Sequence, residues 1–189
     1  MSNAISDVSS RAVIAPESKP KKNVENIDYA TGQGVLGTIL IARSRDGVCA
    51  IMIGSDSKEL KDDLAIRFNK SRLTQDDQNL RDDLQKVIRF IAARTRSLDL
   101  TLDMRGTHFQ QRVWTALCGV PSGSTITYAA LAARIGEPKA VRAVANACAA
   151  NAIALAIPCH RVIRKDGTCS GYRWGEERKR SLIAREALV

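Results

Sequence analysis

Apolar residues in the first half of the chain predict three strands. Residues 35–42 and 48–53 are rich in β-branched and other apolar side chains, and the turn-forming pair Asp46-Gly47 lies between them. This pattern predicts a β-hairpin, with Cys49 as a core residue of its second strand. From residue 98 to residue 104, apolar side chains alternate strictly with polar ones, which is the period of a half-buried strand.

Two helices are predicted between the hairpin and the third strand. The first begins at Ser57 and has apolar residues at every fourth position, namely Leu60, Leu64 and Phe68. The second runs from about residue 77 to residue 96 and has an apolar stripe made of Leu80, Leu84, Val87, Ile88 and Ile91. Strands and helices together predict a small α/β unit, in which we find no candidate catalytic cluster.

The second half of the chain is predicted to be mostly helical. Thr107 and the glutamine three residues after it have the spacing of a capping box, and Thr127 caps a second, short helix that stops at Gly136. Pro138 suits the first position of a third helix that ends near residue 150. The last two helices form a candidate helix-turn-helix, although helical hairpins that bind nothing have the same pattern.

Composition divides the chain into three segments. Residues 1–28 lack apolar periodicity and are predicted to be a flexible tail. Residues 29–105 form the predicted α/β unit, and Arg105-Gly106 marks the boundary to a helical domain over residues 106–189. The predicted class is therefore α+β.

Charge distinguishes the two halves. The 189-residue chain has a formal net charge of +9, of which residues 106–189 carry +7, whereas residues 23–105 are neutral. This asymmetry is expected if the second half binds a polyanion, although a merely basic, solvated surface is an alternative. The helix predicted from Pro138 has six alanines and only two charges, Lys139 and Arg142. It is slim enough to enter a groove, or to be a tightly packed core helix.

Other features argue against several classes of protein. The five cysteines are odd in number, no two have C-x-x-C spacing, and there are two histidines, which argues against a zinc ribbon or a disulfide framework. Reduced thiols are typical of cytosolic proteins. No apolar run reaches the roughly 20 residues of a bilayer span, and residues 1–24 contain no secretory pattern. We therefore expect a cytoplasmic protein without membrane association.

The segment Pro158-Cys159-His160-Arg161-Val162 contains a candidate nucleophile. A thiol in apolar surroundings resists ionisation, so a reactive Cys159 requires a base, for which His160 is a candidate, and a carboxylate that orients the imidazole. Neighbouring side chains on an extended segment point to opposite faces, which favours a bridging water over direct contact. A buried structural cysteine is the alternative.

This motif and its surroundings resemble the O6-alkylguanine-DNA alkyltransferase family. The similarity includes residues 124–151, the run Ser170-Gly171-Tyr172-Arg173-Trp174-Gly175 and the run Ala184-Arg185-Glu186-Ala187. It is dense over residues 106–189, which are similar to the carboxy-terminal domain of bacterial adaptive-response proteins, and looser over residues 30–105. Because a motif with correctly spaced partners on both sides is specific, the resemblance favours a reactive Cys159.

The resemblance implies a fold and a chemistry. The fold is a small ribonuclease H-like α/β domain, with a three-stranded antiparallel sheet and helices, followed by a helical domain with a winged helix-turn-helix. The activity is the irreversible transfer of alkyl groups from O6-alkylguanine, and also O4-alkylthymine, in DNA to Cys159, once per molecule. His160 takes the thiol proton through a water and Glu186 holds the histidine. Asn151 supports the turn that carries Cys159, and Tyr128 rotates the target phosphate and protonates the departing guanine.

The resemblance also implies which residues meet DNA. Arg142 fills the gap left by a flipped nucleotide, because a protein sulfur cannot reach a carbon on O6 inside a stacked duplex. The helix-turn-helix is expected in the minor groove, with phosphate contacts dominating affinity. The expected DNA-binding residues are Thr127, Tyr128, Lys139, Ala140, Arg142 and Ala143. The expected alkylguanine pocket consists of Ile157, Pro158, Tyr172, Arg173 and Trp174.

The implied partner is double-stranded DNA that contains alkylated guanine. We expect a monomer without metal or organic cofactor, in the bacterial cytoplasm and at the nucleoid during repair. The zinc ligands and the transcription-control domain of some relatives are not evident, so inducer function is not predicted for this segment. Two alternatives remain: a cysteine hydrolase that uses Cys159, His160 and Glu186, and a DNA-binding regulator whose helix-turn-helix is its whole function.

Overall fold

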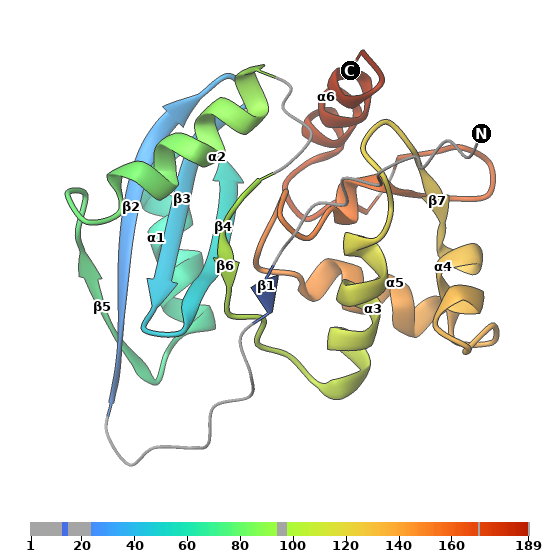
Figure 1. Cartoon of the computed structure of the whole chain (residues 1–189), viewed down its shortest axis with the longest axis horizontal. Helices are drawn as coiled ribbons and strands as arrows, with labels where there is room; N and C mark the ends of the chain where they lie inside the picture. Colours follow the sequence, from blue (N-terminus) through green and yellow to red (C-terminus); the bar gives the residue numbers. More distant parts are fainter. Residues whose placement is uncertain (1–12, 15–23, 94–97, 170, 189) are drawn as a thin grey trace, which may run out of the picture.

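A computed structural model of the chain describes residues 13–14, 24–93, 98–169 and 171–188. A mixed sheet of six strands occupies the first half of the chain (Figure 1), in the spatial order β1-β6-β4-β3-β2-β5. Its strands are β1 (Val13–Ile14), β2 (Glu25–Gly34), β3 (Gly37–Ser44), β4 (Gly47–Gly54), β5 (Ser71–Gln75) and β6 (Thr101–Leu102). The helices α1 (Ser57–Arg67) and α2 (Arg81–Ala93) pack against this sheet.

The predicted hairpin is present as β3 and β4, which pair in antiparallel register. Both strands are buried along almost their whole length, which explains why their sequence is a continuous apolar run rather than an alternating one. Cys49 is 2% exposed and is a core residue, as predicted. The two helices lie on opposite faces of the sheet. Two glycines of the sheet lie directly against these helices. A Cβ atom added to Gly54 of β4 would contact Leu60 of α1, and one added to Gly32 of β2 would contact Leu84 of α2.

The strand predicted over residues 98–104 is much shorter than expected, whereas three antiparallel strands are present as β2, β3 and β4. The segment 98–104 forms only the two-residue strand β6, and β6 pairs with β4 in parallel rather than antiparallel. Its apolar residues are nevertheless all buried: Leu98, Leu100, Leu102 and Met104. Alternation therefore predicted which side chains face the core, but it does not fix the direction of pairing, which depends on how the chain returns to the sheet.

Three further strands of this sheet were not predicted, and two of them correct the expected tail over residues 1–28. β2 begins at Glu25, inside that segment, and β1 at residues 13–14 pairs with β6. The other residues of the expected tail before Val24 lie outside the described residues. β5 pairs in parallel with the start of β2. β5 lies at the edge of the sheet, with β2 beside it. Both strands contain few apolar residues, and backbone hydrogen bonds contribute much of what holds them in the sheet.

The predicted helices of this half are present with shifted ends. α1 starts at Ser57 and buries Leu60 and Leu64, as expected. α2 starts at Arg81 instead of residue 77, because the Asp76 side chain accepts a hydrogen bond from the Asn79 backbone and holds residues 76–79 in a turn. The expected end of this helix at residue 96 lies outside the described residues.

The second half contains four α-helices, one 3₁₀ turn and two short strands among the described residues. They are α3 (His108–Cys118), β7 (Ile126–Thr127), α4 (Tyr128–Arg134), α5 (Val141–Ala150), η1 (Cys159–Arg161), β8 (Val162–Ile163) and α6 (Glu176–Glu186). The capping box at Thr107 and the Thr127 cap are both present. Pro138, however, does not open α5. It lies in a turn that the Ala140 N–H closes on the Glu137 carbonyl (2.8 Å), so α5 starts three residues later than expected.

The two halves share one hydrophobic core. α3 packs on α5 and donates from the Trp114 indole to the Ala147 carbonyl (2.8 Å). The segment that follows α5 crosses to the sheet, where Ile51 of β4 donates to the Ala152 carbonyl and accepts from Ala154, both at 2.9 Å. Within the described residues, no helix has both the length and the apolar character needed to span a membrane.

Candidate active site

Cys159 lies at the end of a hydrogen-bonded turn between α5 and β8. Asn151 caps the end of α5, and its Nδ2 donates to the Ile157 carbonyl (3.0 Å) and to Cys159 Sγ (3.2 Å). Its Oδ1 accepts from the Ile153 N–H (2.8 Å). Leu155, at the centre of this turn, is buried with a φ of 71°. A non-glycine residue in that region costs about 1–3 kcal/mol and persists only where its surroundings enforce it.

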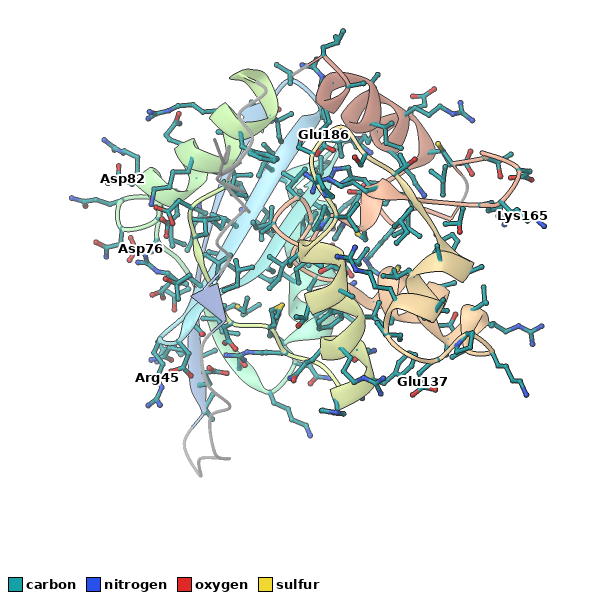
Figure 2. All side chains as sticks on the ribbon, turned by 45° about the vertical axis from the view of Figure 1, so that its right-hand side comes forward. Arg45, Asp76, Asp82, Glu137, Lys165 and Glu186 are labelled. Carbon is teal, nitrogen blue, oxygen red and sulfur yellow. The ribbon has the colours of Figure 1, made fainter. Side chains whose placement is uncertain are left out.

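His160 and Glu186 meet in the interior. His160 is fully buried, and its Nε2 lies 2.8 Å from Glu186 Oε1 at the end of α6. Arg161 binds the same carboxylate through Nε and Nη2, both at 2.9 Å, and donates to the Val120 carbonyl. Figure 2 shows Glu186 where α6 meets the loop before β7, far from Lys165 on the turn after β8. One carboxylate thus orients two side chains of the segment that carries Cys159.

The local backbone differs from the extended segment expected from the sequence. Residues Cys159–Arg161 form a 3₁₀ turn, which is closed by the Val162 N–H on the Cys159 carbonyl. The described residues show no direct hydrogen bond between Cys159 and His160, an arrangement that leaves room for the bridging water inferred from the sequence.

Burial and hydrogen bonding set the protonation states. Burial raises the pKa of the Glu186 carboxyl, but hydrogen bonds from His160 and Arg161 outweigh it and bring the pKa to about 2. Burial lowers the pKa of His160, so its ring is neutral near pH 7. An ionised Glu186 can only accept, so Nε2 carries the ring hydrogen and Nδ1 keeps a lone pair.

The nucleophile itself rests as a thiol. Complete burial raises the pKa of Cys159, while the Asn151 amide and the Lys179 ammonium act in the opposite direction. A protonated thiol has to lose its proton as it reacts, and His160 Nδ1 is a lone-pair nitrogen on the adjacent residue. The arrangement therefore supplies a nucleophile, a base and a carboxylate that orients the base.

Three buried polar atoms in this half have no hydrogen-bond partner among the described residues: His160 Nδ1, the Tyr172 hydroxyl and Trp174 Nε1. Tyr172 and Trp174 are only 8% and 5% exposed. Burial raises the pKa of Tyr172, and the nearby Glu186 carboxylate raises it further. Buried polar groups are almost always hydrogen-bonded, so orphaned groups point to water or a ligand.

The expected pocket residues are only partly gathered here. Ile157 and Pro158 are buried directly before Cys159, and Tyr172 and Trp174 are buried after it. Arg173, by contrast, is exposed and directs its guanidinium to Asp63 of α1 at 2.6 Å.

The expected DNA-binding residues lie on α4 and α5. Thr127 caps α4 and accepts from the Ala130 N–H, and half-buried Tyr128 is the first residue of α4, where burial raises its pKa to about 12. β7 and β8 pair in parallel, which ties this helix start to the segment after Cys159. Four residues of the expected set lie around the start of α5: Lys139, Arg142 and Ala143 are exposed, and Ala140 is half-buried.

Sequence analysis missed Arg161 and Lys179. Arg161 was treated only as part of a motif, yet its guanidinium is 4% exposed and shares Glu186. Lys179 is 1% exposed, and burial lowers its pKa. It lies in a charged run that normally indicates a solvated face. The available indication was its spacing to Leu182 and Glu186, which puts all three residues on one face of α6.

The chain was compared with known protein families and structures. The family model for the DNA-binding domain of 6-O-methylguanine DNA methyltransferase matches residues 108–188. The inducible methylated-DNA–protein-cysteine methyltransferase of Bacillus subtilis is 38% identical over 136 residues, which cover 70% of this chain and 76% of that protein. A crystal structure of Mycobacterium tuberculosis OGT in complex with DNA superposes with a TM-score of 0.73 at 32% identity, covering 85% of this chain and 93% of the other.

The chain belongs to the methylated-DNA–protein-cysteine methyltransferase family. Its mixed α+β fold matches that of the family's solved structures. The bifunctional transcriptional activator/DNA repair enzyme Ada of Escherichia coli is 48% identical over 161 residues, which cover 85% of this chain and 46% of that protein. This methyltransferase-family chain thus spans about half the length of its Ada relatives.

Proposed function

We propose that this chain repairs DNA by moving the methyl group of O6-methylguanine onto Cys159. The observation that carries the proposal is the buried Cys159, His160 and Glu186 arrangement, which leaves one histidine nitrogen free. The relatives named methylated-DNA–protein-cysteine methyltransferases and OGT support the same chemistry. Larger O6-alkyl groups, and O4-alkylthymine, are further proposed substrates of this class.

The reaction proceeds by displacement at carbon. The Cys159 thiol loses its proton to His160 Nδ1 through a water, and the Nε2–H to Glu186 contact (2.8 Å) stabilises the imidazolium that forms. Sulfur then bonds to the methyl carbon while the carbon–O6 bond breaks, and its electron pair leaves with guanine. Because the chain contains no group that reverses a thioether, each molecule acts once.

The departing guanine requires a proton. Tyr128 is the proposed donor. Its hydroxyl is protonated at neutral pH, and burial raises its pKa to about 12. Asn151 does not react; its amide holds the Ile157 carbonyl and the sulfur in place. The flipped base enters beside Ile157, Pro158, Tyr172 and Trp174, where orphaned polar atoms are available to it.

DNA binds through α4 and α5 in this proposal. The outer side of α5 presents alanines and one cation, Arg142, so it can approach a minor groove and place Arg142 in the gap left by the flipped nucleotide. Thr127, Lys139, Ala140 and Ala143 flank this contact, and the phosphates supply most of the affinity. Arg173 reaches DNA only if it leaves Asp63.

Finer features of the fold also belong to the proposal. The three antiparallel strands β2, β3 and β4, with β5 parallel to β2, support a ribonuclease H-like first domain. Helices α3, α4 and α5 with the β7–β8 pair support a winged helix-turn-helix. We further propose a domain boundary near residue 105, a monomeric state, and action on chromosomal DNA in the bacterial cytoplasm.

Intact-protein mass spectrometry after incubation with an O6-methylguanine duplex tests the function. The wild-type chain is expected to gain the mass of one methyl substitution per molecule, whereas Cys159→Ala gains none and still binds the duplex. Cys49→Ala removes a buried thiol from the other half and should still accept the methyl group. An unmodified wild-type chain contradicts the proposal; product release over many turnovers indicates a hydrolase.

A further inference from the structure

The loop over residues 171–175, which we call the pocket loop, is attached to the first half of the chain rather than only to its own domain. Arg173 Nη2 lies 2.6 Å from Asp63 Oδ1 on α1. Its guanidinium also lies over the Trp174 ring, 5.4 Å from the ring centroid. The cation is therefore held between the indole and the carboxylate, and Trp174 is one of the buried side chains with an orphaned polar atom.

The same carboxylate reaches a second part of the site. Arg67, one turn along α1, lies 3.5 Å from Asp63 Oδ2, and its Nη1 donates to the Ala150 carbonyl (3.3 Å). Ala150 is the last residue of α5 and directly precedes Asn151, which binds Cys159. Asp63 thus connects the pocket loop with the end of the helix that supports the nucleophile.

The two arginines depend on this carboxylate. The Arg67 and Asp63 side chains are 17% and 25% exposed. Burial lowers the pKa of Arg67, and the nearby Arg173 charge lowers it further. Removing the negative charge at residue 63 would leave two partly buried guanidinium groups facing each other, a repulsion that moves the more exposed Arg173 and its loop.

A second attachment fixes the other end of the pocket loop. Arg178 of α6 donates to the Trp174 carbonyl (2.9 Å), to the Leu36 carbonyl between β2 and β3 (2.8 Å), and to the Ser55 hydroxyl before α1 (3.0 Å). This contact holds the loop backbone. The Asp63 contact holds the outward side chain of the loop and so determines how Trp174 lies against the pocket.

We propose that Asp63, in the half of the chain without catalytic groups, is a positioning residue for the base pocket. It acts through Arg173 and Arg67 and touches neither the base nor the sulfur. This inference rests on the proposed function, since it concerns the pocket for the flipped base. Loss of Asp63 should therefore weaken binding of the flipped base rather than slow the chemical step, because the contacts of Cys159, His160 and Glu186 do not involve α1.

Single-turnover transfer from an O6-methylguanine duplex, measured against duplex concentration, separates binding from chemistry. For Asp63→Asn we expect the half-saturating concentration to rise about tenfold, with the maximal rate constant within about twofold of wild type. The matched control is Asp62→Asn. Asp62 is adjacent on α1 and pairs with Lys58 at the surface, and its substitution changes the net charge equally. Asp63→Glu keeps the charge but displaces the carboxylate by one methylene, so we expect a smaller rise in the half-saturating concentration, of about threefold.

The coupling to Arg173 is tested by a double-mutant cycle. In an Arg173→Ala background, Asp63→Asn should change the half-saturating concentration by less than about twofold. If Asp63→Asn and Asp62→Asn behave alike while the wild type transfers methyl, Asp63 has no positioning role and the proposed function stands. If the wild type transfers nothing, the proposed function itself fails. Should Asp63→Asn not fold, Asp63→Glu is measured against the same control. A rise of about threefold in its half-saturating duplex concentration supports the positioning role, and an unchanged concentration overturns it.

Discussion

Each half of the molecule contains an arginine–carboxylate cluster, but the two clusters differ in what surrounds them. In the first half, Arg105 binds Glu25 at 2.6 Å and also Asp103, with the arginine and Glu25 side chains each about one-third exposed. In the second half, Arg161 and His160 share Glu186, and the exposed fractions of the three side chains are 4%, 0% and 11%. The first cluster is partly exposed to solvent, whereas the second is buried, and within the described residues its His160 Nδ1 has no hydrogen-bond partner.

The difference teaches that residue types alone do not define a reactive site. An exposed ion pair contributes little and does no chemistry, because water screens it. A buried ion pair destabilises the fold unless its polar atoms are hydrogen-bonded. Among the described residues, the cluster's His160 Nδ1 has no such bond, so this nitrogen is available for proton transfer. The cluster of the first half is not reactive in this comparison. Even so, α1 and β4 of that half bind the segment before Cys159 through backbone hydrogen bonds.

The largest expected difference between the clusters is in transfer rate. Glu186→Gln removes the charge that stabilises the His160 imidazolium, and we expect the transfer rate constant to fall about 100-fold. Glu25→Gln removes a carboxylate of the exposed cluster, and the rate should stay within about twofold of wild type. Single-turnover assays with saturating methylated duplex measure both variants. An equal fall in the transfer rate constants of the two variants would mean that burial of the second cluster does not contribute to the reaction.

Acid should weaken the second cluster more than the first. The folded pKa of Glu186 is about 2 against an ordinary 4.5, so its stabilisation is complete above about pH 5 and is lost as pH falls toward 2, by roughly 3 kcal/mol. Buried His160 acts in the same direction, because a lowered folded pKa means that stability falls as pH drops below about 6.5. Chemical denaturation between pH 7 and pH 3 measures the loss. Glu186→Gln should flatten the profile more than Glu25→Gln, and identical profiles would contradict this assignment.

One added negative charge should distinguish the DNA-facing half. Ala143→Glu on α5 and Gln85→Glu on α2 both place a carboxylate at an exposed helical position. We expect the first to weaken binding of a duplex about tenfold through repulsion from phosphates, and the second to change it by less than about twofold. The free energy of unfolding of both variants should lie within about 0.5 kcal/mol of the wild-type value, because surface substitutions rarely change it by more. Fluorescence anisotropy with a labelled duplex measures the affinity of each variant. Similar affinities for the two variants would mean that DNA does not bind at α5.

The smallest expected effect is on the salt dependence of binding. If Lys139 neutralises one phosphate, Lys139→Ala lowers the log–log slope of affinity against salt by about 0.9. Lys70→Ala removes an exposed lysine from the first half and should leave the slope unchanged. Titrations at several salt concentrations measure both slopes, and an unchanged slope for Lys139→Ala removes that residue from the phosphate contacts.

Local sequence patterns predicted those parts of the fold that depend on neighbours along the chain. The capping box at Thr107, the Thr127 cap and the hairpin of β3 and β4 all follow from a few adjacent residues, and each is present. Sequence patterns did not reveal the polar strands β2 and β5 or the parallel direction of β6, because these features depend on backbone pairing with distant segments, which no periodicity records. The start of α5 was misplaced for a local reason: Pro138 lies in a turn that the Ala140 N–H closes on the Glu137 carbonyl.

Motif and resemblance identify the candidates for chemistry: Cys159 and His160 follow from a short motif, and Glu186 and Asn151 from family resemblance at fixed spacing. The protonation states and partners of these side chains depend on the fold. Burial by segments from both halves keeps His160 neutral, Arg161 and Lys179 lie in the interior, and Arg173 pairs with Asp63 of the other half. The reason is physical: a side chain's identity is local, whereas its desolvation and its partners depend on segments brought together by the fold.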